Sequence, residues 1–361
     1  MATQQSIDAP ARSYDAIIIG SGAGGATLAL RLVQAGRRVL VVEKGDWYKP
    51  RPGEANDYLY DIHGVADAFS YVGGKTKFYG AALYRYRESD FREVQFETGV
   101  SPAWPFGYDE LEPYYDEAEK LYRVHGSPDG DPSEPKRATA YPFPPLPHDP
   151  VVAKVIARLE AKGFPAAPIP RGLDQGPGGA CVMCAACDVH FCKRDAKMDA
   201  ETAALRPALA TGLVDLMTLT ECEKVLLTPD GKRAEGVMLT RNGQSYRVLS
   251  DTVVVAAGAP QSALLLRRSG VLARGEPARH RSLALAGHDV TSRLRAFARR
   301  HDGRVAVADR GQPPRPDDGG DAHAHGDAAG GRGPHGDAGA QPAGQRRPRG
   351  GELVVSQRSR P

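Results

Sequence analysis

Residues 14–43 constrain the fold more than any other stretch, because apolar runs and a glycine-rich loop alternate there in a recognisable order. Ala16–Ile19 is a short apolar run, typical of a parallel strand buried on both faces. Apolar residues at helical spacing follow it and predict a helix that stops at Gly36. A second apolar run, Val39–Val42, predicts another strand and leads to Glu43. The order strand, helix, strand places the chain in the α/β class.

The loop between the first strand and the helix fits the dinucleotide-binding pattern G-x-G-x-x-G. Gly20 allows a tight turn, Gly22 lets the backbone approach a pyrophosphate, and Gly25 permits close packing of helix on strand. Glu43 is placed to accept hydrogen bonds from a ribose diol and would repel the 2′-phosphate of NADP. A glycine-rich turn without a ligand is the alternative, but strand, helix and acid in register predict binding of FAD or NAD. The residues expected at the cofactor are Gly20, Ser21, Gly22, Ala23, Gly24, Gly25 and Glu43.

Three later stretches carry further motifs in a fixed order. Residues 72–87 read VGGKTKFYGAALYRYR, residues 101–119 read SPAWPFGYDELEPYYDEAE, and residues 253–270 read VVVAAGAPQSALLLRRSG. Together with the N-terminal loop they resemble the glucose–methanol–choline (GMC) family of flavin oxidoreductases. The resemblance covers residues 14–270 and favours FAD over NAD.

The resemblance implies a fold and a set of cofactor contacts. The expected fold is a Rossmann-like FAD-binding domain with part of an antiparallel-sheet substrate domain. The family's flavin loop, followed by an arginine, is similar to Gly73-Gly74 and Arg85. By analogy with such flavoproteins, the main chain of Val225 contacts the adenine, and the second family signature contributes Ala257 and Gly258.

The resemblance also implies a reaction, in which an alcohol carbon is oxidised while a hydride passes to the flavin and a base takes the hydroxyl proton. The substrate would be a small alcohol or sugar, and an electron-acceptor protein is a further expected partner. In the family the base is a histidine beyond the second signature. None of the four histidines before residue 271 matches it, so we assign no catalytic residue: His63, His125, His148 and His190.

Residues 271–361 depart from the family in composition. They contain 16 arginines and 10 acidic residues but no Lys, Asn, Ile, Met, Cys, Tyr or Trp, and so bury too little apolar area to fold. We interpret this segment as a disordered, out-of-frame tail, which excludes His323 and His325 as catalytic candidates. The chain is then expected to be a truncated and inactive flavoenzyme half.

Two other functions remain open on the sequence alone. The first is an NAD-dependent dehydrogenase, which the later motifs disfavour. The second is a non-enzymatic protein that binds nucleic acid or metal through the arginine-rich tail. The net charge of +3 originates in that tail, so the rest of the chain gives no reason to expect nucleic-acid binding. No apolar run has membrane-spanning length and no signal peptide is evident, which favours a cytoplasmic protein without a membrane span.

A cysteine-rich stretch, GACVMCAACDVHFCKRDAK, holds four of the five cysteines. The pattern C-x2-C-x2-C-x4-C is close to a bacterial ferredoxin run, although a lysine follows where the proline belongs. It also resembles a cysteine-rich segment of one GMC branch, which includes sugar and polyol dehydrogenases. Two readings stay open, an iron–sulfur or other metal site and a structural loop with reduced thiols or one disulfide. The metal reading assigns the ligands to Cys181, Cys184, Cys187 and Cys192.

The remaining pattern indicates organisation. Residues 1–13 are expected to be flexible, 14–270 to form the FAD-binding domain with incomplete substrate-domain insertions, and 271–361 to be the tail. Alternating runs between residues 218 and 239 predict a small sheet with a turn at Pro229-Asp230-Gly231. Residues 126–150 contain eight prolines and predict a surface excursion, and residues 151–163 predict an amphipathic helix whose apolar face packs on the protein.

Overall fold

The computed structural model of the protein describes residues 6–49, 57–58, 70–97, 99–184 and 186–271. These residues all belong to one compact unit of the chain. The expected tail after residue 271 and His63 lie outside the described residues.

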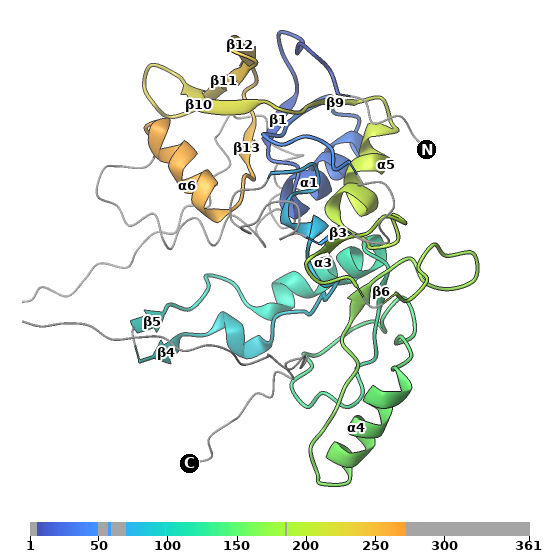
Figure 1. Ribbon diagram of the computed structural model, residues 1–361. Helices are drawn as coiled ribbons and strands as arrows, with labels where there is room; N and C mark the ends of the chain where they lie inside the picture. The colour runs from blue at the N-terminus through green and yellow to red at the C-terminus, as the bar shows by residue number, and fades with distance from the viewer. Residues whose placement is uncertain (1–5, 50–56, 59–69, 98, 185, 272–361) are drawn as a thin grey trace, which may run out of the picture. The chain divides into compact units, whose positions relative to one another are not determined.

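Four parallel strands form the central sheet, in the order β13-β1-β2-β9 (Figure 1). Their bounds are β1 Ala16–Ile19, β2 Val39–Val42, β9 Val214–Met217 and β13 Val253–Val255. Helix α1, Ala23–Gln34, connects β1 to β2. The predicted α/β class and the predicted strand–helix–strand unit are confirmed.

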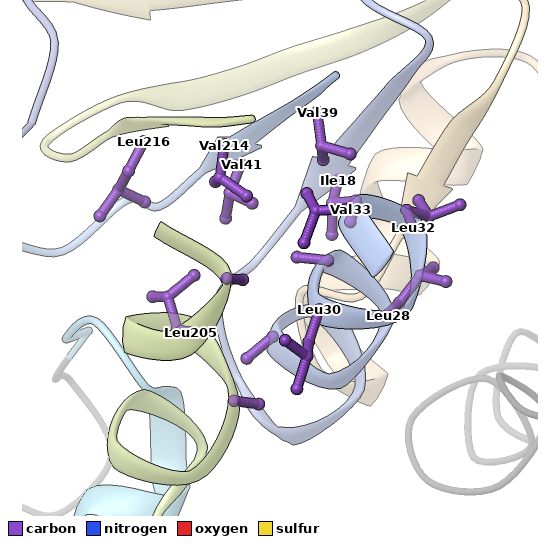
Figure 2. Close-up of a cluster of buried hydrophobic side chains, with 14 of the residues drawn as sticks. Ile18, Leu28, Leu30, Leu32, Val33, Val39, Val41, Leu205, Val214 and Leu216 are labelled. Atoms are coloured by element: carbon purple, nitrogen blue, oxygen red, sulfur yellow. The ribbon is translucent and has the colours of Figure 1, made fainter. Parts of the chain in front are cut away.

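Both faces of this sheet are buried, which explains the unbroken apolar runs. Ile18, Val41 and Leu216 point to the face covered by α1, in the cluster drawn in Figure 2. The alternate residues Ile17 and Leu40 point to the opposite face, into a second apolar cluster. Side chains of a strand alternate between its two faces, so each strand supplies both clusters.

A three-stranded antiparallel sheet, in the order β10-β11-β12, and helix α6 contribute to the second cluster. The bounds are β10 Glu221–Leu227, β11 Ala234–Arg241, β12 Gln244–Leu249 and α6 Ala259–Arg268. The small sheet predicted between residues 218 and 239 is confirmed, with the two runs on either side of Glu223 joined in one strand. The sequence reasoning missed β9 and β12.

Short elements connect these layers. The helical ones are η1 Gly74–Lys77, η2 Glu88–Phe91, α3 Tyr108–Leu121, α4 Pro150–Glu160, the π-helix η3 Glu201–Leu205 and α5 Arg206–Leu209. The paired short strands are β3 Asp57–Tyr58 with β8 His190–Phe191, β4 Val94–Phe96 with β5 Gly99–Ser101, and β6 Val124–His125 with β7 Arg171–Gly172. Among the described residues, no helix is long and apolar enough to cross a membrane.

Helix α4 forms where the amphipathic pattern predicts it, but its expected packing is wrong. None of its residues is buried, and Val151, Val152 and Val155 on the apolar face are exposed. The helix is stabilised locally, because the Asp149 side chain accepts a hydrogen bond from Val151 N and Pro150 occupies the first turn. An amphipathic pattern thus predicted the helix without predicting a covering partner.

Candidate functional site

The turn after β1 requires glycine at its first position. Gly20 has φ +100°, and a Cβ there would overlap the main chain of Ala256 at the end of β13. A Cβ on Gly25 would overlap the Gly20 carbonyl, so helix and strand approach as closely as the sequence pattern predicts. The loop therefore lies at the carboxyl ends of β1 and β13, where open α/β sheets bind ligands.

The N-terminus of α1 is left open to a ligand. Its N-cap is Gly22, which has no side chain to accept hydrogen bonds from the first turn. That turn contains no acidic residue. Free N–H groups and the partial positive charge of a helix N-terminus together favour a bound anion such as a phosphate.

Glu43 follows β2 and lies close to the glycine loop. Its Oε2 accepts hydrogen bonds from Ser21 N at 3.0 Å and Ser21 Oγ at 2.6 Å, and its Oε1 accepts one from Gly45 N at 2.9 Å. Glu43 is 7% exposed. A carboxylate offers about four lone-pair positions, so three bonds leave Oε1 able to accept one more donor.

A second glycine loop lies against the first. Gly73 N donates to Ser21 Oγ at 3.1 Å, and both Gly73 and Gly74 have positive φ, 91° and 59°. A Cβ on Gly74 would lie 2.9 Å from Gly22 Cα, whereas a Cβ on Gly22 would meet only Gly74 Cα, at 3.9 Å. The fold thus brings residues 52 positions apart in the sequence face to face.

The third predicted segment follows β13. Gly258 has φ +80° and is the N-cap of α6, and Ala257 N donates to Ser262 Oγ at 3.1 Å. Val225 is buried on β10, and its N–H donates to Ser269 Oγ at 2.8 Å. The structure therefore brings the Gly20–Gly25 loop, Glu43 and Gly73-Gly74 together. The adenine contact expected of Val225 stays a prediction, with its amide engaged by Ser269.

The residues present fit a dinucleotide. Gly22 and Gly74 bring the two loops into van der Waals contact, and neither residue places a side chain at the start of α1. The open N-terminus of α1 can hold a phosphate, and Glu43 retains an acceptor position for a ribose hydroxyl. We conclude that the three features needed for the phosphates and one ribose occur together.

A buried ionic cluster lies behind the second glycine loop, and sequence reasoning missed it. Lys77 Nζ lies 2.9 Å from Asp199 Oδ2 and 2.7 Å from Glu201 Oε2, and all three side chains are almost fully buried. Burial lowers the pKa of Lys77, but the two carboxylates raise it by more, so the pKa is raised overall. Glu201 also pairs with Arg206. The only sequence signal is a run of charged residues in an apolar context, which alone predicts a solvated surface.

No hydrogen bond among the described residues connects Arg85 to either glycine loop. Its buried guanidinium binds Glu119 through two nitrogens at 2.8 Å, and also contacts Asp116 and Tyr108 on α3. Arg137, within the proline-rich stretch, also pairs with Glu119. The family-like arginine therefore anchors α3 and the proline-rich excursion.

The three described histidines have no observed contact with the candidate cofactor site. His125 is buried, stacks on Phe143 and contacts the Pro144 carbonyl through Nδ1 at 3.0 Å. His190 belongs to β8, and His148 is exposed. No contact of these three with the glycine loops is observed, and none is assigned as a base.

The cysteine-rich stretch is organised around other groups. Ala180 N and Cys181 N donate to Asp174, and Arg194 Nε donates to the Ala180 carbonyl. The cysteines form no disulfide. Within the described residues, which include all five cysteines, no three His, Cys, Asp or Glu side chains are arranged to hold a metal ion. The iron–sulfur reading of these cysteines therefore finds no support.

The comparisons with known proteins agree on one family. A family model described as GMC oxidoreductase matches residues 14–294, beyond the end at Gly270 expected from the motifs. The chain is 34% identical over 282 residues to 6'''-hydroxyparomomycin C oxidase of Streptomyces lividus and, over the same length, to paromamine 6'-oxidase of Streptomyces fradiae; each match covers 72% of this chain and 50% of the relative. The chain therefore spans about half the length of these curated relatives.

One further relative and one solved structure are also similar to the chain. The chain is 36% identical over 157 residues to 2-methyl-1,2-propanediol dehydrogenase of Mycolicibacterium austroafricanum, covering 37% of this chain and 28% of that protein. Pyridoxine 4-oxidase from Mesorbium loti has a similar structure, with 19% identity and a TM-score of 0.46, over 71% of this chain and 52% of that chain.

Proposed function

The chain belongs to the GMC oxidoreductase family, and we propose that residues 14–270 bind FAD as the cofactor-binding part of an oxidoreductase that acts on CH–OH groups. The observation that carries the proposal is the opposition of Gly22 and Gly74, with Glu43 hydrogen-bonded to the same loop. The family binds FAD, and the two glycine loops with Glu43 offer the phosphate and ribose contacts that such a dinucleotide needs. The proposed contacts are Gly20, Ser21, Gly22, Ala23, Gly24, Gly25, Glu43, Gly73, Gly74, Val225, Ala257 and Gly258.

The proposed roles follow from the local chemistry. The N–H groups at the start of α1 hold the pyrophosphate, the Glu43 carboxylate accepts a hydrogen bond from a ribose hydroxyl, and Gly74 keeps the facing loop free of side chains. When bound, FAD supplies the group that accepts a hydride from the alcohol carbon. The proposed role of these residues is to position the FAD.

The proposed substrate is a small hydroxyl-bearing molecule, an alcohol or a sugar. Relatives named for the oxidation of paromamine and hydroxyparomomycin and for the dehydrogenation of a propanediol support this class. We assign no base, because the three described histidines have other contacts or are exposed. The described residues supply no histidine base, and we propose that the chain binds FAD without oxidising alcohols.

The test is a titration of the purified, flavin-free protein with FAD and, separately, with NAD. Binding is followed by quenching of flavin fluorescence and by calorimetry. We expect FAD to bind and NAD to compete weakly. Binding of NAD alone would refute the proposal and favour a nicotinamide-dependent enzyme. Bleaching of bound FAD by an added alcohol without air would refute the proposed lack of turnover.

A further inference from the structure

Lys197 is completely buried, and its ammonium group is surrounded by main-chain oxygens. Nζ donates to the carbonyls of Lys77 at 2.8 Å, Tyr79 at 3.0 Å, Cys187 at 2.9 Å and His190 at 2.7 Å. An ammonium has three protons, so four carbonyls saturate it. Burying a charge is costly unless it is hydrogen-bonded, and here the bonds come from the main chain of two distant segments.

The first pair of carbonyls belongs to the segment that carries the second glycine loop. Lys77 is the last residue of η1, which begins at Gly74, and Tyr79 follows two residues later. The second pair belongs to the cysteine-rich stretch and to β8. The two segments are also joined by a hydrogen bond from Val189 N to the Phe78 carbonyl, at 2.7 Å. Lys197 therefore fastens the two segments to each other.

The residues after Lys197 support the same loop from behind. Ala200 N donates to Thr76 Oγ1 at 2.9 Å, and Thr76 Oγ1 donates to the Gly73 carbonyl at 2.6 Å. A Cβ on Gly73 would lie 3.1 Å from Glu201 Cβ, so there is no space for the loop to retreat. Support from one side and Gly22 on the other fix where Gly73-Gly74 lies.

We propose that Lys197 is a positioning residue for the second glycine loop. Through the Lys77 and Tyr79 carbonyls it holds Gly73-Gly74 opposite Gly22, and through the Cys187 and His190 carbonyls it is itself held by the cysteine-rich stretch. The inference rests on the proposed FAD site for its functional consequence. It gives the cysteine-rich stretch a structural role that requires no metal. It also explains why a lysine, with no carboxylate among its four hydrogen-bond acceptors, is buried at this position.

The test compares Lys197→Met and the milder Lys197→Gln with Arg137→Met. Arg137 is also a buried cation, but its ion pairs are with Glu119 and Glu134 and do not involve the second glycine loop. Amide hydrogen exchange of the FAD-free proteins is measured first. We expect exchange in residues 73–79 to accelerate about tenfold or more in the Lys197 variants and to stay unchanged in Arg137→Met, since hydrogen bonds to a charged group are lost.

FAD affinity is the second readout. We expect the dissociation constant to rise about tenfold or more for Lys197→Met, with an intermediate value for Lys197→Gln, relative to Arg137→Met. Folded Lys197 variants with wild-type exchange in residues 73–79 would overturn the proposal. Failure of the wild-type protein to bind FAD would instead refute the proposed function, and the exchange measurement would still decide the role of Lys197.

A measurement on the wild-type protein alone decides the case if neither variant folds. Coupling between two segments is reciprocal, so FAD bound at the glycine loops must also protect the segment fastened to them. We expect amide exchange in residues 187–191 to slow on adding FAD. Protection of residues 73–79 without any change in residues 187–191 would overturn the proposal.

Discussion

The hydroxyl of Ser21 donates a 2.6 Å hydrogen bond to Glu43 Oε2 and accepts one from Gly73 N at 3.1 Å. Ser21 is fully buried. One small side chain therefore joins the loop after β1, the acid after β2 and the second glycine loop. The first and last of these lie more than 50 residues apart in the sequence. The three parts of the candidate site are held together before any ligand is bound.

Ser21→Ala is expected to lower the free energy of unfolding by about 1–3 kcal/mol, because it leaves the buried Gly73 N–H without its acceptor and removes one donor from Glu43. Urea unfolding followed by circular dichroism measures the change. Ser133→Ala is the matched control, since its hydroxyl donates to Asp131 at an exposed position and its loss is expected to cost less than about 0.5 kcal/mol. Equal losses in both variants would contradict the linking role of Ser21.

Two glycines of the same loop are expected to respond differently to alanine. Gly25→Ala places a methyl group on the Gly20 carbonyl and is expected to destabilise the protein by about 3 kcal/mol or more, since the main chain must move. Gly22→Ala has φ −70° and room for a Cβ, so its stability is expected to change by about 1 kcal/mol or less. The Gly22 methyl group enters the space proposed for the pyrophosphate, however, so FAD binding is expected to be lost.

Thermal unfolding and FAD titration on the two variants separate these effects. Gly36→Ala is the control for backbone strain, because Gly36 has φ +74° but nothing within 4 Å of its missing Cβ. It is expected to cost about 1 kcal/mol and to leave FAD affinity unchanged. A stable Gly22→Ala variant with wild-type FAD affinity would argue against the proposed position of the cofactor.

The elements predicted best from the sequence are those whose pattern has a single physical cause. Strands β1 and β2 were predicted with their observed bounds, because a short apolar run between turn residues has few alternatives when both faces are buried. The glycine positions of the first loop follow from steric rules, and the structure agrees at Gly20 and Gly25. β12 was missed because its exposed residues carry no strong pattern.

The cofactor site was only partly predictable. Motif spacing indicated Glu43 and Gly73-Gly74, but nothing local in the sequence shows that Ser21 joins them. Lys197 was noticed only as the end of a cysteine motif, since its four acceptors are main-chain carbonyls without a sequence signature. Tertiary hydrogen bonds to the backbone are invisible to residue patterns, which is why the cysteines drew attention to a metal.

Arg85→Met is expected to destabilise the protein by about 3–5 kcal/mol at pH 7, because the buried carboxylates on α3 lose their main partner. Hydrogen bonds from Arg85 lower the pKa of Asp116 below its usual value, although burial acts in the opposite direction. A lowered pKa in the folded state stabilises the fold above the unfolded value, about 3.9, and this contribution is lost as pH falls through the folded pKa.

Urea midpoints of wild type and Arg85→Met at pH 7 and at about pH 3.5 test this relationship. We expect the difference in stability between the two proteins to shrink at the lower pH, because protonated carboxyl groups no longer need the guanidinium. At pH 7 the folded fraction of Arg85→Met is expected to bind FAD with wild-type affinity, since Arg85 donates its hydrogen bonds to α3. A difference that grows on acidification would show that Arg85 stabilises the fold through something other than these carboxylates.

The five cysteines are expected to react with iodoacetamide at separate rates. Burial raises the pKa of Cys222 to about 12 and also raises that of Cys187, and only the thiolate reacts, so both are expected to be slow at pH 7. Cys184 is exposed and is expected to be labelled first. Peptide mapping by mass spectrometry at successive times gives the order, with the urea-unfolded protein as the control for intrinsic reactivity.

Raising the pH to about 9 sharpens the comparison, because thiols with an ordinary pKa, about 8.5, are then mostly thiolate. Cys222 is expected to remain protected until the protein unfolds, since a thiol with a raised pKa stays protonated. Cys187 is the informative residue, because its carbonyl is one of the acceptors of Lys197. Burial lowers the pKa of Lys197 to about 8, so this comparison is made at pH 7, where the ammonium is charged. Slow labelling of Cys187 in the wild type and fast labelling in Lys197→Met would show that Lys197 keeps this part of the stretch closed, while equally fast labelling in both proteins would contradict that role.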